Sequence, residues 1–157
     1  MLRDEIVDLG PYAFDELTYE MAVHKCAPLW QRRYGIEIVL QIEHIELSPE
    51  AAGELFLITQ EAVLNAGRHA SASTVSISLR SLGDKLELSV VDDGKGLGEV
   101  DPLAPAQPGH LGLANMRERA ELLDGELLID SSEQGTKVVV RAPYRHATRA
   151  QSSVAGS

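Results

Sequence analysis

The sequence predicts one globular domain of the α+β class, in which helices and β-hairpins follow one another along the chain. The first observation is composition: 157 residues, 44% hydrophobic and 24% charged, are the balance of a single soluble domain. The second is helical spacing of apolar residues in several segments, and the third is alternation of apolar and polar residues around two short turns. A chain of this length buries roughly two-thirds of its unfolded surface, so its core needs no metal or disulfide.

Charge and cysteine content exclude several classes of protein. The net charge of -10 repels nucleic acid and anionic membrane surfaces alike. Cys26 is the only cysteine, and the five histidines lack the spacing of metal ligands. No stretch approaches the roughly 18 apolar residues of a membrane span, and Met1 leads into charged residues. We therefore expect a cytoplasmic chain with no nucleic-acid partner and no direct membrane contact.

The first third of the chain is predicted to form two helices and a strand. Residues 1–9 have apolar positions at helical spacing and stop at Gly10-Pro11, which predicts the last turns of a helix. A second helix is predicted from about Phe14 to Tyr34, closed by Gly35. The alternation over 36–47 then predicts a strand that places its even-numbered apolar residues on one face: Ile36, Ile38, Leu40 and Ile42.

A third helix is predicted from Ser48 to about Ala70, with Ser48 as N-cap and Pro49 at the first helical position. Its core residues are expected to be Leu55, Ile58, Ala62 and Ala66. Alternation over 74–80 and 86–92, around Gly83-Asp84, predicts a hairpin.

A last helix is predicted from Leu113 to Gly125, with Leu113, Met116, Ala120 and Leu123 toward the core. Residues 126–131 and 136–143 predict a second hairpin across Glu133-Gln134-Gly135. The tail from Arg145 onward, rich in serine and alanine, is predicted to be disordered.

Polar residues gather on one face of the helix that begins at Ser48. The spacing of four, three and one places these residues beside the apolar face: Glu61, Asn65, Arg68 and His69. For any one of them, a solvated helix face is the ordinary interpretation.

At the end of the next hairpin, Asp92 is followed by Gly94 and Gly96, so a carboxylate precedes backbone that side chains do not obstruct. Such a carboxylate can accept a hydrogen bond from an exocyclic amine, although an ordinary turn has the same composition.

Residues 92–109 are rich in glycine and proline and lack periodicity, and a loop of this length inside a domain is usually functional. The following Gly109-His110-Leu111-Gly112-Leu113 opens a helix, whose free N–H groups form a natural anion site. Prolines follow the first glycines and no Walker lysine motif exists, which disfavours both common nucleotide folds. Together these features predict an adenine-nucleotide pocket, with residues 97–109 as a lid that becomes ordered when nucleotide binds.

Four segments carry a resemblance to the ATP-site motifs of sensor histidine kinases: QEAVLNAGRHA (60–70), VVDDGKGL (90–97), GHLGLANMRERAELLDGEL (109–127) and GTKVVVRAP (135–143). Residues 2–17 resemble the junction before the catalytic domain in the nitrate-sensor and desaturase-thermosensor type of these kinases. The superfamily includes gyrase, the large heat-shock chaperones and the mismatch-repair protein MutL. The resemblance implies a two-layer α/β sandwich of the Bergerat type, with a mixed, mostly antiparallel sheet and helices on one face. It also implies a junction at 1–17, a catalytic domain at 18–144 and a tail at 145–157.

Matched residue by residue, the resemblance implies which residues would bind the two ends of an ATP molecule. Asn65 would bind the Mg²⁺ ion between the phosphates, and Glu61 would act in that ion's water shell or in proton handling. Asp92 would bind the adenine amino group, helped by Thr136 through water. The remaining residues fall into three sets: Gly94 and Gly96 beside the base; Arg68 and His69 facing the phosphates; and Gly109, His110, Gly112 and Leu113 closing over the triphosphate.

The sequence departs from this family pattern in two ways. Gly67 occupies a helix position where the family usually has a larger side chain, at a cost of roughly 1 kcal/mol relative to alanine. No segment supplies the acceptor histidine followed by aspartate, and His24 lacks that context. We therefore expect a fragment of a longer dimeric kinase, inactive alone.

The resemblance thus implies a catalytic domain that transfers the γ-phosphoryl group of ATP to a histidine on a dimerisation domain, for relay to a response regulator. The alternative is a free-standing regulator of the anti-sigma type, which phosphorylates a serine on a partner or acts by binding. An ATP-hydrolysing clamp like gyrase would need a following domain with a catalytic lysine.

Overall fold

The computed structural model describes residues 13–96 and 111–143. The elements along these ranges are a 3-10 helix, three α-helices and five strands: η2 (Ala13–Asp15), α1 (Tyr19–Tyr34), β1 (Glu37–Ile42), α2 (Pro49–Arg68), β2 (Thr74–Leu82), β3 (Lys85–Asp92), α3 (Leu111–Leu122), β4 (Glu126–Ser132) and β5 (Gly135–Pro143). None of these helices is long and apolar enough to cross a membrane.

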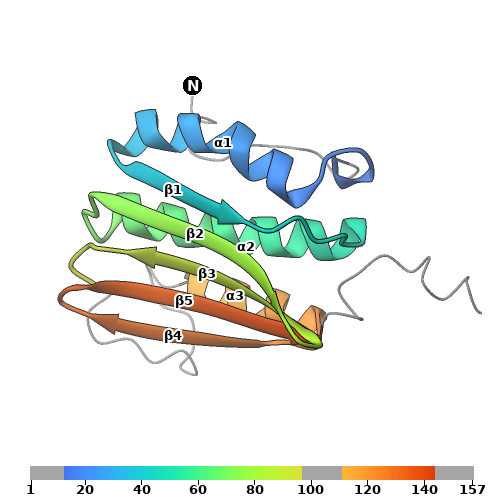
Figure 1. The fold of residues 1–157 in the computed structure, drawn as a ribbon. Coiled ribbons are helices and arrows are strands. Elements are labelled where there is room, and N and C mark those ends of the chain that lie inside the picture. The colour runs from blue at the N-terminus through green and yellow to red at the C-terminus, as the bar shows by residue number, and fades with distance from the viewer. Residues whose placement is uncertain (1–12, 97–110, 144–157) are drawn as a thin grey trace, which may run out of the picture.

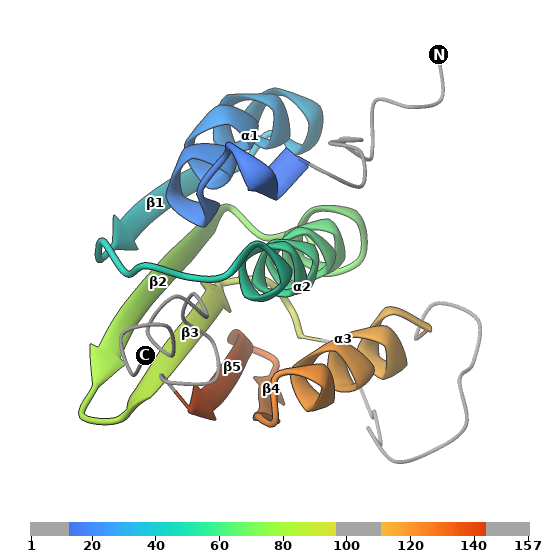
Figure 2. The ribbon, with the colours of Figure 1, turned by 90° about the vertical axis from the view of Figure 1, so that its right-hand side faces the viewer.

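The strands form one sheet in the order β1-β2-β3-β5-β4 (Figure 1). β1 pairs with β2 in parallel, and the other three pairs are antiparallel. Figure 2 shows the three α-helices of residues 13–96 and 111–143 side by side on one face of the sheet, and none of these helices covers the other face, called here the uncovered face. The predicted α+β class and the two-layer sandwich with a mixed, mostly antiparallel sheet are therefore confirmed.

The central helix α2 forms for the reasons that the sequence suggested. The Ser48 side chain accepts a hydrogen bond from the Ala51 amide at 3.0 Å, and Pro49 opens the helix. The four predicted core residues of α2 are all buried: Leu55, Ile58, Ala62 and Ala66. α2 packs against α1 on one side, α3 on the other and the sheet beneath, so it is the element that joins the layers.

Aromatic side chains fill the contact between α1 and α2. The Phe56 ring of α2 lies 5.8 Å from the Phe14 ring and 6.1 Å from the Trp30 ring, measured between centroids. Tyr19 and Thr59 are both buried, and their hydroxyl oxygens are 2.7 Å apart, so these two hydroxyl groups are hydrogen-bonded to each other. This interface fixes the orientation of α2.

Gly67 has a packing reason that the sequence did not reveal. A methyl group built on its Cα would lie 2.5 Å from Cγ of Tyr34, the last residue of α1. The absence of a side chain at Gly67 therefore lets the end of α1 lie directly against α2. Gly67 therefore destabilises α2 as an isolated helix but permits a close contact between α2 and α1.

Several predicted boundaries differ from the structure by one or more residues. The first described helix begins at Tyr19, not near Phe14, because Thr18 caps it by accepting a hydrogen bond from the Met21 amide at 3.1 Å. The first strand ends at Ile42, not at residue 47, since Leu79 accepts the last bond of the ladder from the Glu43 amide. Helix α3 ends at Leu122, and Gly135 is the first residue of β5, paired with Ser132.

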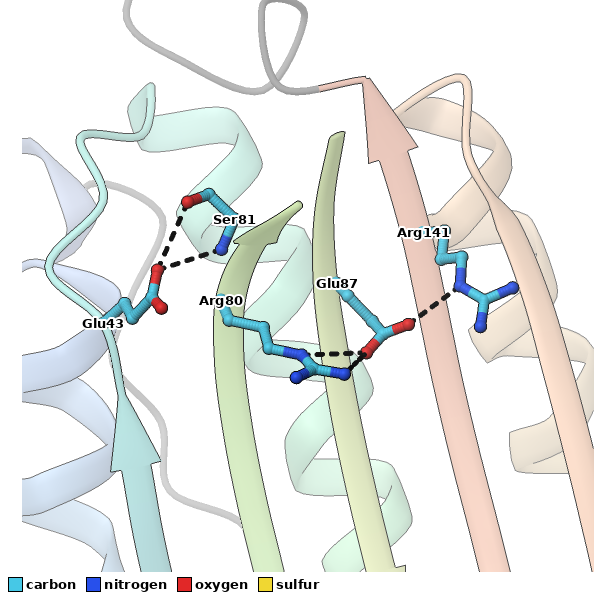
Figure 3. A network of polar contacts seen from close by, with 5 residues as sticks. All are labelled: Glu43, Arg80, Ser81, Glu87 and Arg141. Atoms are coloured by element: carbon cyan, nitrogen blue, oxygen red, sulfur yellow. Dashed lines mark hydrogen bonds and ion pairs between the residues drawn. The ribbon is translucent and has the colours of Figure 1, made fainter. Parts of the chain in front are cut away.

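The uncovered face of the sheet carries a network of charged residues (Figure 3). Glu87 of β3 lies between Arg80 of β2 and Arg141 of β5, which donate hydrogen bonds to its two carboxylate oxygens at 3.1 and 2.8 Å. The Glu87 side chain is 8% exposed. Hydrogen bonds from Arg141 and Arg80 lower its pKa, against the opposing effect of burial. The pairing ties three adjacent strands together on the side opposite the helices.

The predicted segments at both ends extend outside the described residues. Only residues 13–17 of the junction predicted at 1–17 are described, and the predicted tail at 145–157 lies outside. The domain boundaries therefore stay predictions.

The Gly67–Tyr34 contact yields a stability prediction. We expect Gly67→Ala to lower the free energy of unfolding by about 1 to 3 kcal/mol, because overpacking outweighs the gain in helix propensity. Urea unfolding of the purified chain measures the difference. In a Tyr34→Ala background the same substitution should be neutral or stabilising. If Gly67→Ala stabilises the wild-type chain, the close contact with Tyr34 does not exist in solution.

Candidate functional site

The four motifs singled out in the sequence converge at one end of the domain. The carbonyl of Ala70, just after α2, accepts a hydrogen bond from the Lys95 amide at 2.8 Å, which joins the first motif to the second. Asp92 at the end of β3 pairs with Thr136 at the start of β5, which joins the second motif to the fourth. The third motif begins α3, which packs along α2. Residues far apart in sequence thus form one continuous surface region.

Two glycines of the second motif make this convergence possible. A methyl group on Gly94 would lie 2.5 Å from the Ala70 carbonyl oxygen, so the chain after β3 lies directly on the end of α2. Gly96 has a φ of +84°, and a methyl group there would overlap the Ser132 carbonyl at the end of β4. Packing and backbone conformation therefore require glycine at both positions, in addition to the unobstructed backbone that was predicted there.

Asp92 is a buried carboxylate at the end of a strand. It is 9% exposed, and its Oδ1 accepts a hydrogen bond from the Gly94 amide at 2.8 Å. Burial raises the pKa of Asp92, although amide hydrogen bonds from Gly94 and Thr136 oppose this effect. Thr136 beside it is 5% exposed, and its hydroxyl lies 3.0 Å from that of Ser131. A buried carboxylate and a buried hydroxyl thus lie side by side at the paired ends of β3 and β5, where they can hydrogen-bond a ligand.

Asp93, the neighbour of Asp92, has a structural role that the sequence analysis missed. Its Oδ1 accepts hydrogen bonds from the amides of Ser73 at 2.7 Å and Thr74 at 3.0 Å. These bonds lower the pKa of the Asp93 carboxyl. Because Thr74 begins β2, Asp93 fixes the turn between α2 and β2 beside the site. The Asp-Asp-Gly sequence was the only available signal for this role.

Glu61 and Asn65 lie one turn apart on α2, and both are half-buried. Burial raises the pKa of Glu61, and the nearby positive charges of Arg68, His69 and Arg119 oppose that rise. The structure thus brings Arg68 and His69 close enough to act on Glu61, as their predicted common face requires. Both are exposed at the end of α2, where His69 donates its backbone amide to the Asn65 carbonyl at 3.0 Å.

The first turn of α3 lies against Glu61. A methyl group on Gly112 would overlap the Glu61 carboxylate, so the helix start approaches the acidic group as closely as a glycine allows. The Leu113 side chain is 4% exposed within the core, which leaves only its backbone to face a ligand. Gly109 and His110, and the predicted lid at 97–109, lie outside the described residues.

The donor atoms of the site fit a magnesium ion bound mainly by phosphates. Residues 13–96 and 111–143 hold no group of three histidine, cysteine, aspartate or glutamate side chains that could form a metal cage. The Asn65 amide and the Glu61 carboxylate provide neighbouring oxygen atoms on one face of α2. Mg²⁺ prefers oxygen ligands and keeps several waters or phosphate oxygens, so this small donor set suits it.

A cavity of about 220 Å³ lies elsewhere, between η2, the start of α1 and the segment after β1. Its lining includes Ile42, Leu79 and Ala52, at the ends of β1 and β2 opposite the four motifs. It also includes five carboxylates: Asp15, Glu16, Glu20, Glu43 and Glu46. These carboxylates repel a triphosphate, so the cavity is no competitor for an anionic ligand.

Comparisons with known proteins identify the family of the chain. Residues 50–146 match the model of the family described as histidine kinase-, DNA gyrase B- and HSP90-like ATPases. The sensor histidine kinase MctS of Rhizobium johnstonii is 34% identical over 138 residues, covering 87% of this chain and 30% of MctS.

Solved structures show the same fold. The histidine kinase domain of a blue-light activated histidine kinase from Erythrobacter litoralis superposes with a TM-score of 0.71 and 23% identity, covering 81% of this chain and 61% of that one. Full-length ShkA in complex with AMPPNP gives a TM-score of 0.57 and 19% identity, covering 80% of this chain and 29% of that one.

The chain therefore belongs to the family of histidine kinase-, DNA gyrase B- and HSP90-like ATPases. Within that family, the similarity to MctS across most of this chain identifies an ATP-binding catalytic domain of the sensor histidine kinase kind. The chain spans about a third of the length of MctS.

Proposed function

We propose that this domain binds Mg-ATP and donates the γ-phosphoryl group to a histidine on the dimerisation and phosphoacceptor domain of its kinase, for relay to a response regulator. The observation that carries the proposal is the meeting of the four motifs, through Ala70–Lys95, Asp92–Thr136 and Gly112–Glu61, at one end of the domain. Because the reaction draws on cytoplasmic ATP, we place this domain in the cytoplasm.

The adenine base is proposed to bind at the end of β3. The amides of Gly94 and Thr136 donate hydrogen bonds to the Asp92 carboxylate, whose two oxygens retain the capacity to accept another from the adenine amino group. Thr136 supports this contact through a water molecule, and Gly94 and Gly96 keep side chains away from the plane of the base. Burial of Asp92 strengthens a hydrogen bond made there, since water competes less for the carboxylate.

The phosphates are proposed to lie between the end of α2 and the start of α3. Free amide groups at a helix N-terminus bind anions, and Gly112 keeps this end open. Arg68 and His69 at the end of α2 offer a positive charge and a hydrogen-bond donor on the same side. Gly109, His110 and Leu113 complete the predicted phosphate contacts through the lid and the backbone of α3.

Asn65 is proposed to hold the Mg²⁺ ion, with Glu61 binding its water shell or handling a proton. When bound, the ion offsets negative charge on the phosphates. The chain's own contribution to transfer is mainly to orient ATP and to place cationic and amide groups around the triphosphate. Glu61 lies one helical turn from Asn65 and beside the start of α3, which suits either role, and burial raises its pKa.

The adenine assignment predicts the effect of Asp92→Asn. This substitution replaces an acceptor oxygen by a donor that faces the adenine amino group, so ATP and ADP should bind at least about tenfold more weakly. Isothermal titration calorimetry measures the affinity, and thermal unfolding shows whether the fold persists. Ser89→Ala, on the uncovered face of β3, is the control. Unchanged ATP affinity in a folded Asp92→Asn variant would remove Asp92 from the adenine site.

The metal assignment predicts that Asn65→Ala reduces the effect of Mg²⁺ on ATP affinity. Affinity from the adenine end should persist, because Asp92 and Asn65 belong to different elements. The measurement compares ATP titrations with Mg²⁺ and with a chelator, for both proteins. A magnesium effect of the same size in the variant would contradict a ligand role for Asn65.

The function itself predicts transfer in trans. The chain alone should incorporate little phosphate from ATP, and addition of the dimerisation segment of its own kinase should produce acid-labile phosphohistidine on that segment. A segment with glutamine in place of the acceptor histidine is the control. Acid-labile phosphate on the chain alone, or acid-stable phosphoserine on a partner, would refute the proposal, and phosphoserine would favour the anti-sigma type.

A further inference from the structure

The start of α3 is held in place by the way the whole helix packs. Three apolar residues of α3 and one just after it are buried in the core: Leu113, Met116, Ala120 and Leu123. α3 packs chiefly against α2 and to a smaller extent against β4 and β5. Packing of these side chains into the grooves between neighbouring residues sets an approximate register of α3 on α2. Polar contacts between the two helices can restrict that register further.

Two contacts restrict that register. Near its start, α3 touches α2 where Gly112 abuts the Glu61 carboxylate. Further along, Nη1 of Arg119 lies 2.9 Å from Oε1 of Glu54, and these side chains are only 36% and 24% exposed. Arg119 follows Gly112 by two helical turns, and Glu54 precedes Glu61 by the same two turns. The helices therefore run antiparallel, with two contacts about 10 Å apart on each of them.

We propose that Arg119 is a positioning residue for the triphosphate: its ion pair with Glu54 holds α3 in the register that places the helix start beside Glu61 and Asn65. The inference rests on the proposed function and adds to it a residue that touches neither nucleotide nor metal. A shift of α3 by one turn would move its N-terminus by about 5.4 Å, which is beyond the reach of any hydrogen bond to the phosphates.

The partial burial of the pair supports this role. An ion pair on an open surface contributes little, whereas a partly desolvated charge that loses its partner is costly. Glu54 lies 65 residues from Arg119 in sequence, so the pair is a tertiary contact between two elements of the site. The adenine end, formed by Asp92 and Thr136 on β3 and β5, does not depend on α3. Loss of the pair should therefore weaken phosphate binding selectively.

Charge reversal distinguishes positioning from simple electrostatics. Arg119→Glu adds negative charge near the triphosphate, so weaker ATP binding by that variant has two explanations. Glu54→Arg adds positive charge, which by electrostatics alone would tighten ATP binding. If the pair sets the register, Glu54→Arg should instead weaken ATP because two arginines then repel across the helix contact. The double variant Glu54→Arg/Arg119→Glu restores an ion pair in reversed order.

The experiment measures the affinities of Mg-ATP and adenosine by calorimetry for the wild-type chain, both single variants and the double variant. We expect each single variant to lose at least about tenfold in ATP affinity while adenosine stays within about twofold, and the double variant to recover most of the loss. Arg141→Glu is the matched control, because it breaks a 2.8 Å ion pair to Glu87 on the uncovered face of the sheet. It should leave the ratio of the two affinities unchanged.

Three results would overturn the inference: tighter or unchanged ATP binding by Glu54→Arg, equal losses for ATP and adenosine, or no recovery in the double variant. In each case a wild-type chain that binds ATP leaves the proposed function intact. A wild-type chain that binds no ATP would refute the proposed function and this inference together.

Discussion

The packing of α2 between α1, the sheet and α3 is the constraint on which the rest of the structure depends. Its core face is buried against the sheet. On one side, Phe56 of α2 stacks on Trp30 of α1, and on the other side Glu54 of α2 pairs with Arg119 of α3. The end of this helix then carries Glu61 and Asn65, and the Ala70 carbonyl just beyond it receives the chain after β3. A change in the position of α2 would therefore move both ends of the proposed ATP site at once.

Close contacts at three glycines bring the elements of the proposed site together. Gly67 admits Tyr34, Gly94 admits the Ala70 carbonyl, and Gly112 admits the Glu61 carboxylate. At Gly94 a larger residue would meet the backbone of Ala70 and separate two elements, whereas at Gly67 and Gly112 a side chain, Tyr34 or Glu61, would have to move. Gly67 lowers the intrinsic stability of α2 as a helix, but it allows α1 to pack directly against α2. Glycines in such motifs thus have packing roles as well as ligand roles.

Local chemistry in the sequence was sufficient to predict much of the fold. The Ser48 cap, the core residues of α2 and both hairpins follow from capping and periodicity alone. The prediction failed at Phe14 and at Ile45, because Phe14 packs against the core from the separate 3-10 helix η2 and Ile45 from backbone outside the strand, so each continues the apolar pattern past the true boundary. The Arg119–Glu54 pair could not be predicted, since only the folded helices bring residues 65 positions apart together.

The acidity of the chain poses a physical problem that the proposed site must solve locally. A net charge of -10 opposes the approach of a triphosphate, yet many of the carboxylates lie away from the site, five of them around the cavity beyond β1. At the site itself, Arg68, His69 and the start of α3 surround the half-buried Glu61. Burial raises the pKa of Glu61, and the positive charges of Arg68, His69 and Arg119 oppose that rise. In the proposed site, the attraction of the anion would therefore depend on these short-range groups, and a bound magnesium ion would offset the charge that remains.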